Sequence, residues 1–147
     1  MTSAFKTVLD TAKAALLQSP AVAGGRVYVG RDLATPLDAA SDVNLTLAAQ
    51  DGEPFVLGNG PTDWVVDLGV EIRARGSDSV DAVAAIDPLI ETAYARLAAI
   101  AWPAGVMGVS ALRGRLDSQE AASPVAGWQF ALSINLRTAS GSLALAP

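Results

Sequence analysis

Residues 64–75 read WVVDLGVEIRAR, and apolar and polar residues alternate almost without fault along this run. A second run, residues 128–138, reads WQFALSINLRT and alternates in the same way. Because successive side chains of a β-strand point to opposite faces, a period of two predicts two long strands, each with one apolar and one polar face. The sequence therefore indicates a sheet that is buried on one side, which is common for antiparallel sheets.

Two further segments have apolar residues at helical spacing. The first begins at Thr2 or Ser3 and ends near Gln18, and the second covers residues 78–100, with Asp78 as its N-cap. Val80, Val83 and Tyr94 belong to the apolar positions of this second helix. Pro88 lies inside the second segment, so we expect a kink there or the start of a new helical segment capped by Asp87.

The remaining segments complete an α+β pattern. Shorter strands are predicted at residues 26–29, 43–49 and 106–117, and the glycines and prolines of residues 50–63 predict a long loop. Helix, strands, long helix and strands in this order predict a two-layer domain. Its sheet is mainly antiparallel or mixed, with two helices packed on one face. We expect one domain over residues 1–138 and a flexible C-terminal tail over residues 139–147.

Composition excludes several classes of chemistry. The 147 residues include no His and no Cys, which excludes disulfides, thiolate chemistry and histidine acid–base catalysis. The net charge is -5, and an acidic chain is a poor general binder of nucleic acid. Hydrophobic residues make up 51% and charged residues 17%, against about 25% charged residues in typical domains. One explanation is that other subunits cover some of the apolar surface. The other is that the chain is simply rich in alanine, with no consequence for assembly.

No membrane segment is expected. The longest uncharged stretch, residues 97–112, is shorter than the ~20 residues of a spanning helix and contains Pro103, Gly105 and Gly108. The N-terminus lacks the continuous apolar core of a secretory signal. The expectation is a soluble intracellular product.

No group of residues makes a clear catalytic site. Asp67 and Glu71 share a strand face, but Arg73 and Arg75 follow on that face, and cross-strand ion pairing explains all four. The glycine runs lack the ending of a phosphate-binding loop, and Asp78 with Asp81 is too small a set for calcium. We therefore expect no enzyme activity, no metal and no cofactor.

Arginines gather on the polar faces of the predicted strands. By strand parity, five of them lie opposite the apolar rows: Arg73, Arg75, Arg113, Arg115 and Arg137. One interpretation is ordinary pairing with Asp67, Glu71 and Asp117. The other is a patch that faces a neighbouring subunit, a partner or a pore, since the planar guanidinium binds carboxylates in a bidentate manner.

The order of these segments resembles the tail terminator family of long-tailed bacteriophages and phage-like particles, also called tail completion or minor tail proteins. The resemblance rests on a short N-terminal helix followed by RVYV at residues 26–29, and on a long loop ahead of WVVDLGVEI at residues 64–72. The helix of residues 78–100 and a last strand at residues 128–138 complete it. It covers roughly residues 5–138.

The resemblance implies a structural protein and a steric mechanism. Members of this family form homohexameric rings on the head-proximal end of the tail tube, stop the addition of tube protein and present a joint to the head connector. DNA passes through the lumen without specific binding, and the ring belongs to the virion, assembled in the bacterial cytoplasm. On this reading the loop of residues 50–63, with Phe55, Asn59 and Asp63, contacts the tube or a neighbouring subunit.

Two alternatives stay open. In the first, the chain is another neck component, such as a head-closure or tube-like protein. In the second, it is a small ligand-binding or enzymatic α+β domain. The latter requires a pocket with convergent polar groups.

Overall fold

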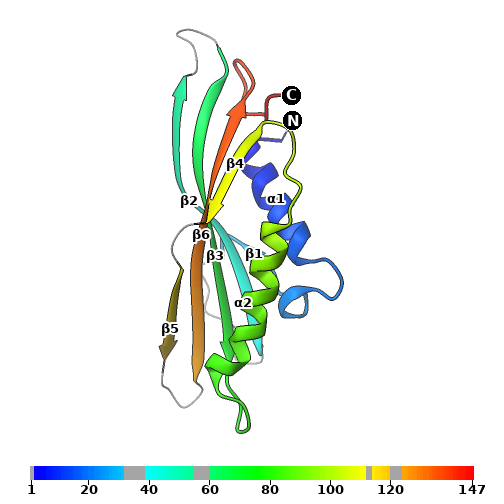
Figure 1. Ribbon diagram of the computed structural model, residues 1–147, viewed down its shortest axis with the longest axis vertical. Helices are drawn as coiled ribbons and strands as arrows, with labels where there is room; N and C mark the ends of the chain where they lie inside the picture. The colour runs from blue at the N-terminus through cyan, green and yellow to red at the C-terminus, as the bar shows by residue number, and fades with distance from the viewer. Residues whose placement is uncertain (1, 32–38, 55–59, 112–113, 120–123) are drawn as a thin grey trace.

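The sheet and its two helices form two layers (Figure 1). The computed structural model describes residues 2–31, 39–54, 60–111, 114–119 and 124–147. Within these residues the elements are α1 (Ala4–Leu16), a 3-10 turn (Val22–Gly25), β1 (Val27–Val29), β2 (Ser41–Pro54), β3 (Thr62–Arg75), α2 (Ala82–Ala98), β4 (Val106–Ala111), β5 (Arg115–Gln119) and β6 (Val125–Thr138). The predicted α+β class is confirmed.

The strands join in the order β1-β2-β3-β6-β4, and β5 also pairs with β6. β1 and β2 are parallel, and the other pairs are antiparallel. β3 and β6 form the centre and pair along their whole length, from Thr62 opposite Thr138 to Arg75 opposite Val125. The sheet is therefore mixed, as expected.

Burial along β3 and β6 follows the alternation of the sequence. Even-numbered side chains of both strands face the helices, and odd-numbered ones face away, half-buried or exposed. The buried row comprises Val66, Leu68, Val70, Ile72, Ala74, Ala126, Phe130, Leu132, Ile134 and Leu136. The prediction of a sheet buried on one face is confirmed.

The helices divide this apolar face between them. α1 contacts β1 and β2, whereas α2 contacts β3 and β6. Phe5 of α1 meets Trp64 of β3 edge to face, with 5.1 Å between ring centroids. Tyr94 of α2 lies against Phe130 of β6 at 5.8 Å. These aromatic contacts orient both helices on the sheet, and the Phe5 contact also links α1 to β3.

The sequence predicted the N-cap of one helix correctly and that of the other wrongly. Ser3 caps α1, where its hydroxyl accepts a bond from the Lys6 amide at 3.3 Å. α2 begins three residues later than predicted, because Asp81 and not Asp78 accepts the Ala84 amide, at 2.8 Å. The Ser77 hydroxyl accepts the Val80 amide, so the residues around Asp78 form a turn ahead of the helix.

α2 continues through Pro88 as a single helix, so the alternative of a new segment starting there is wrong. Proline removes the bond to the carbonyl four residues earlier, which here belongs to Ala84. Both Ala84 and Pro88 are exposed, so water can satisfy that carbonyl.

The predicted loop of residues 50–63 is too long. β2 extends to Pro54 and β3 begins at Thr62, so half of the predicted loop belongs to these two paired strands. A β-carbon on Gly52 would lie 2.6 Å from the Trp64 ring, so this glycine makes room for the ring across the ladder. Phe55 and Asn59 lie outside the described residues.

The predicted strand of residues 106–117 is also corrected, because it is two strands. β4 pairs with Leu132–Leu136 of β6, and β5 pairs with the other end of the same strand, residues 125–129. Together β4 and β5 form one edge of the sheet.

The C-terminal segment, residues 139–147, turns back onto the domain. The Ala146 amide donates to the Arg137 carbonyl at 2.9 Å, and the Leu143 carbonyl accepts the amide of Ala4 at 2.7 Å. Leu145 packs against the core. Since Ala4 is the first residue of α1, the segment satisfies one of the amides that a helix N-terminus leaves without an internal partner.

Truncation after Ala139 is expected to lower the free energy of unfolding by about 1–2 kcal/mol, because it removes these bonds and the Leu145 contact. Urea unfolding of the full and truncated chains measures the difference. Unchanged stability would mean that the segment is as mobile in solution as its composition predicts.

Candidate functional site

The face of the sheet away from the helices carries the predicted arginines. Arg73 and Arg75 of β3 and Arg137 of β6 occupy odd-numbered positions on this outer face, as strand parity predicts. Arg137 binds Asp63, directly opposite on β3, through two bonds of 2.6 and 2.9 Å. The bidentate geometry fixes both side chains at one end of the strand pair.

The bond from Arg137 holds the pKa of the Asp63 carboxyl below its ordinary value of 3.8, against a smaller opposing effect of desolvation. A carboxyl whose pKa is lower in the folded than in the unfolded state stabilises the fold above its unfolded pKa. That contribution is lost as the pH falls through the lowered value.

Asp63→Asn is therefore expected to reduce stability slightly at neutral pH and to flatten its decline below about pH 4. Urea unfolding at pH 7 and pH 3 measures both effects. Asp78→Asn, in the exposed turn before α2, is the matched control. An acid decline as steep in Asp63→Asn as in the wild type would contradict the assignment.

A second ion pair lies near the other end of β3. Arg73 donates to Glu71 through Nε at 3.2 Å and Nη2 at 2.9 Å, and the Gln129 amide on β6 donates to the same carboxylate oxygen at 3.1 Å. The pairing interpretation therefore holds for Arg73 and Arg137. Their partners are Glu71, as expected, and Asp63, which the sequence assigned to a contact loop.

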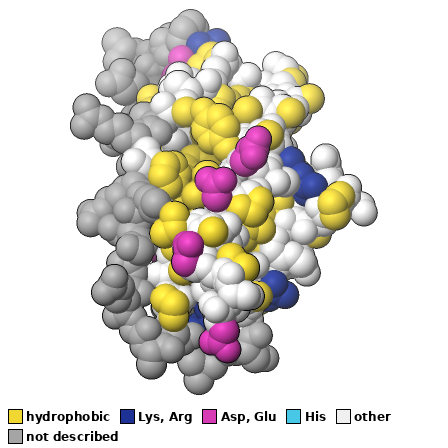
Figure 2. All heavy atoms as spheres, turned by 60° about the horizontal axis from the view of Figure 1, so that its bottom comes forward, with side chains coloured by type: hydrophobic (Ala, Val, Ile, Leu, Met, Phe, Trp, Pro, Cys, Tyr) yellow, Lys and Arg dark blue, Asp and Glu magenta, His cyan; other side chains and the backbone are white. Residues whose placement is uncertain are grey.

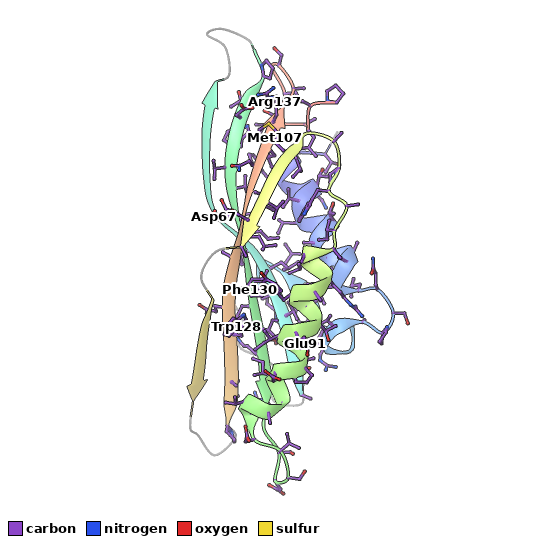
Figure 3. All side chains as sticks on the ribbon, viewed as in Figure 1. Asp67, Glu91, Met107, Trp128, Phe130 and Arg137 are labelled. Carbon is purple, nitrogen blue, oxygen red and sulfur yellow. The ribbon has the colours of Figure 1, made fainter. Side chains whose placement is uncertain are left out.

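The arginines do not form one patch. Asp63 and Arg73 are ten residues apart on β3, roughly 33 Å along the strand. Figure 3 shows Arg137 at one end of the sheet, with Asp67 near its middle. Gly69 lies between Asp63 and Arg73 on β3, and the Thr46 side chain fills the space that this glycine leaves.

Two of the predicted arginines cannot be placed on this face. Arg113 lies outside the described residues. Arg115 pairs with Gln129 in the ladder between β5 and β6, and its side chain lies outside the described part. The outer face therefore combines three placed arginines with the carboxylates of Asp63, Asp67 and Glu71. An interface role for these residues stays a prediction.

A different surface was missed by sequence reasoning. Tyr94, Met107 and Val109 are 47%, 53% and 39% exposed, although the spacing of α2 placed Tyr94 in the core. Val80 and Val83 are exposed as well, which corrects the same prediction. A groove of about 370 Å³ runs between α2 and β4, and its lining includes Leu97, Trp102 and Leu132. The absence of charge in VMGVSA, residues 106–111, was the available signal.

A larger groove, of about 940 Å³, lies between α1 and α2. Its charged side chains already have partners. Asp10 binds Lys6, and the Arg96 guanidinium donates to the carbonyls of Leu16, Gln18 and Pro20. Small residues of both helices line much of the rest. The groove thus offers few polar groups to orient a ligand.

The described residues lack two features of other classes of protein. No helix in these ranges has the length and apolarity to cross a membrane. No three acidic side chains in the same ranges come together in a way that would hold a metal ion.

Comparisons with known proteins add no family. No protein-family model matches the sequence, and no curated protein is significantly similar to it.

Proposed function

We propose that this protein is a ring-forming structural subunit that caps the head-proximal end of a phage tail tube. Six copies form the ring, stop the addition of tube protein and provide the joint to the head connector. The observation that carries the proposal is the exposed apolar surface formed by Tyr94 of α2 and by Met107 and Val109 of the uncharged edge strand β4. Exposed apolar surface next to an open sheet edge is typical of surfaces that another chain covers.

The shape of the sheet supports a ring. Its two edges differ: β1 has three residues, and the opposite edge is built from β4 and β5. Contacts between unlike edges are heterologous, and heterologous contacts close into rings when the rotation allows. An isologous dimer would instead need one surface that is complementary to itself.

The outer face supports passage of DNA without specific binding. Phosphate contacts need unpaired Lys or Arg. On this face Arg73 and Arg137 are bound to Glu71 and Asp63. If the outer face lines the lumen, its paired charges favour neither strong attraction nor strong repulsion of DNA.

The test is tube length. Tail tube protein of the same particle is polymerised with and without this protein, and tube lengths are measured by electron microscopy. We expect tubes that stop growing once rings occupy their ends, and overlong tails on particles that lack the protein. Light scattering should give a hexamer.

Unchanged tube lengths would contradict the proposal. Particles with tails of normal length and filled heads that leak DNA would instead identify a head-closure protein. A strictly monomeric species, with and without tube protein, would contradict both.

A further inference from the structure

One side of the domain combines exposed apolar and acidic side chains. Residues 83, 87, 91, 94 and 98 of α2 are all exposed and recur every three or four positions, so they form one stripe along the helix. Tyr94 lies against Phe130 of β6, so this stripe runs along the β6–β4 side, whereas Arg96 faces α1. We call this side the acidic flank; it comprises Val83, Asp87, Glu91, Tyr94, Met107 and Val109.

The acidic flank includes an open strand. β4 contains no charge and no proline, the two features that usually protect an edge strand from pairing. Among the described strands, β4 pairs with β6 alone. Figure 2 shows hydrophobic side chains exposed over one face of the molecule, with Asp and Glu side chains between them. Figure 3 places Met107 on β4 and Glu91 on α2.

The described residues at the opposite edge of the sheet include two cations, Lys13 and Arg31. Val29 of β1 is 42% exposed, and the Arg31 guanidinium lies over the Tyr28 ring at 4.3 Å from its centroid. Lys13 lies on the side of α1 away from α2, since Thr7, Thr11 and Ala14 line the groove between the helices. We call this side the basic edge; it comprises Lys13, Tyr28, Val29 and Arg31.

We propose that the acidic flank of one copy docks on the basic edge of a second copy, head to tail. The assignment rests on the proposed ring and names its subunit contact. Each side offers exposed apolar groups, and the carboxylates of Asp87 and Glu91 are complementary to Lys13 and Arg31. Because the two surfaces lie at opposite edges of one sheet, each copy binds two neighbours. Two copies do not pair through the same surface, as they would in an isologous dimer.

Two blocked variants test the contact. Tyr94→Glu with Met107→Glu places two charges in the apolar part of the acidic flank. Val29→Glu with Arg31→Glu makes the basic edge repel Asp87 and Glu91. Each variant alone is expected to weaken self-association at least roughly a hundredfold, as for interface hot spots.

Mixing the two blocked variants gives the decisive measurement. Each contributes one intact surface, so an equimolar mixture is expected to form a heterodimer that grows no further. Analytical ultracentrifugation of each variant and of the mixture measures this. Val65→Glu, on the outer face, is the matched control and should assemble like the wild type. Circular dichroism and thermal melting show that each variant is folded.

Three results would overturn the assignment. The first is normal assembly by either folded variant, the second is a mixture that stays monomeric, and the third is loss of assembly in Val65→Glu as well. Rings that form through other surfaces would leave the proposed function standing. If the variants pair head to tail as predicted but the wild type does not change tube length, the subunit contact is supported and the proposed tail function is contradicted.

Discussion

Val66→Ala is expected to lower the free energy of unfolding by about 2–3 kcal/mol, and Val65→Ala by less than about 0.5 kcal/mol. The two valines are neighbours in β3, so residue type, substitution and strand propensity are matched. Val66 is fully buried opposite Ile134 of β6, whereas Val65 is 46% exposed on the outer face. The difference between the two variants therefore reports burial on the two faces.

Urea unfolding measures both values, and an unchanged dependence on urea shows that the unfolded states are comparable. The measurement is made at a concentration where the protein is monomeric, so that subunit contacts do not contribute. Equal losses at the two positions would contradict a sheet covered by helices on one face.

The central strands could be predicted from the sequence because local pattern and tertiary burial agree there. Every even position of residues 64–74 is apolar, and in the structure that row faces the helices. The Ser3 cap and the approximate length of both helices followed from similarly local rules. The parallel pairing of β1 with β2 could not be predicted from the sequence, because no local pattern specifies the connection between these strands.

The errors arose where a residue type has two physical roles. Gly52 was read as a loop signal, yet it makes room for the Trp64 ring inside the β2–β3 ladder. Asp78 and Asp81 both have N-cap chemistry, and the burial of Ala82 and Ile86 decides that the helix starts after Asp81. The flexible tail predicted from the small residues of 139–147 stays a prediction, and the main-chain bonds of this segment to α1 and β6 do not depend on side-chain type.

The candidate site was predicted in part. Parity placed Arg73, Arg75 and Arg137 on the correct face, but it gave no distance along the strands. Pairing of Arg137 with Asp63 depends on the register between β3 and β6, which was not assigned. The acidic flank was missed because Tyr94 was assigned to the core from its spacing alone.

Arg96→Met is expected to lower the free energy of unfolding by about 3 kcal/mol. The guanidinium of Arg96 donates to the carbonyls of Leu16, Gln18 and Pro20, at 3.1, 2.8 and 2.6 Å. These carbonyls lie at and beyond the C-terminus of α1, where helical carbonyls lack internal partners and favour a positive charge. Methionine keeps much of the apolar stem and removes all three bonds.

Arg96→Lys separates charge from geometry. Lysine keeps the positive charge near the end of α1 but lacks the planar fork that reaches several carbonyls at once, so an intermediate loss is expected. Lys6→Met is the control, because it removes a cation from an exposed pair with Asp10 on the same helix. Hydrogen exchange should show faster opening of the last turn of α1 in Arg96→Met. If Arg96→Met were as stable as Lys6→Met, the prediction would be contradicted. Hydrogen bonds from water would then satisfy these carbonyls as well as Arg96 does, and apolar burial alone would hold α1 against α2.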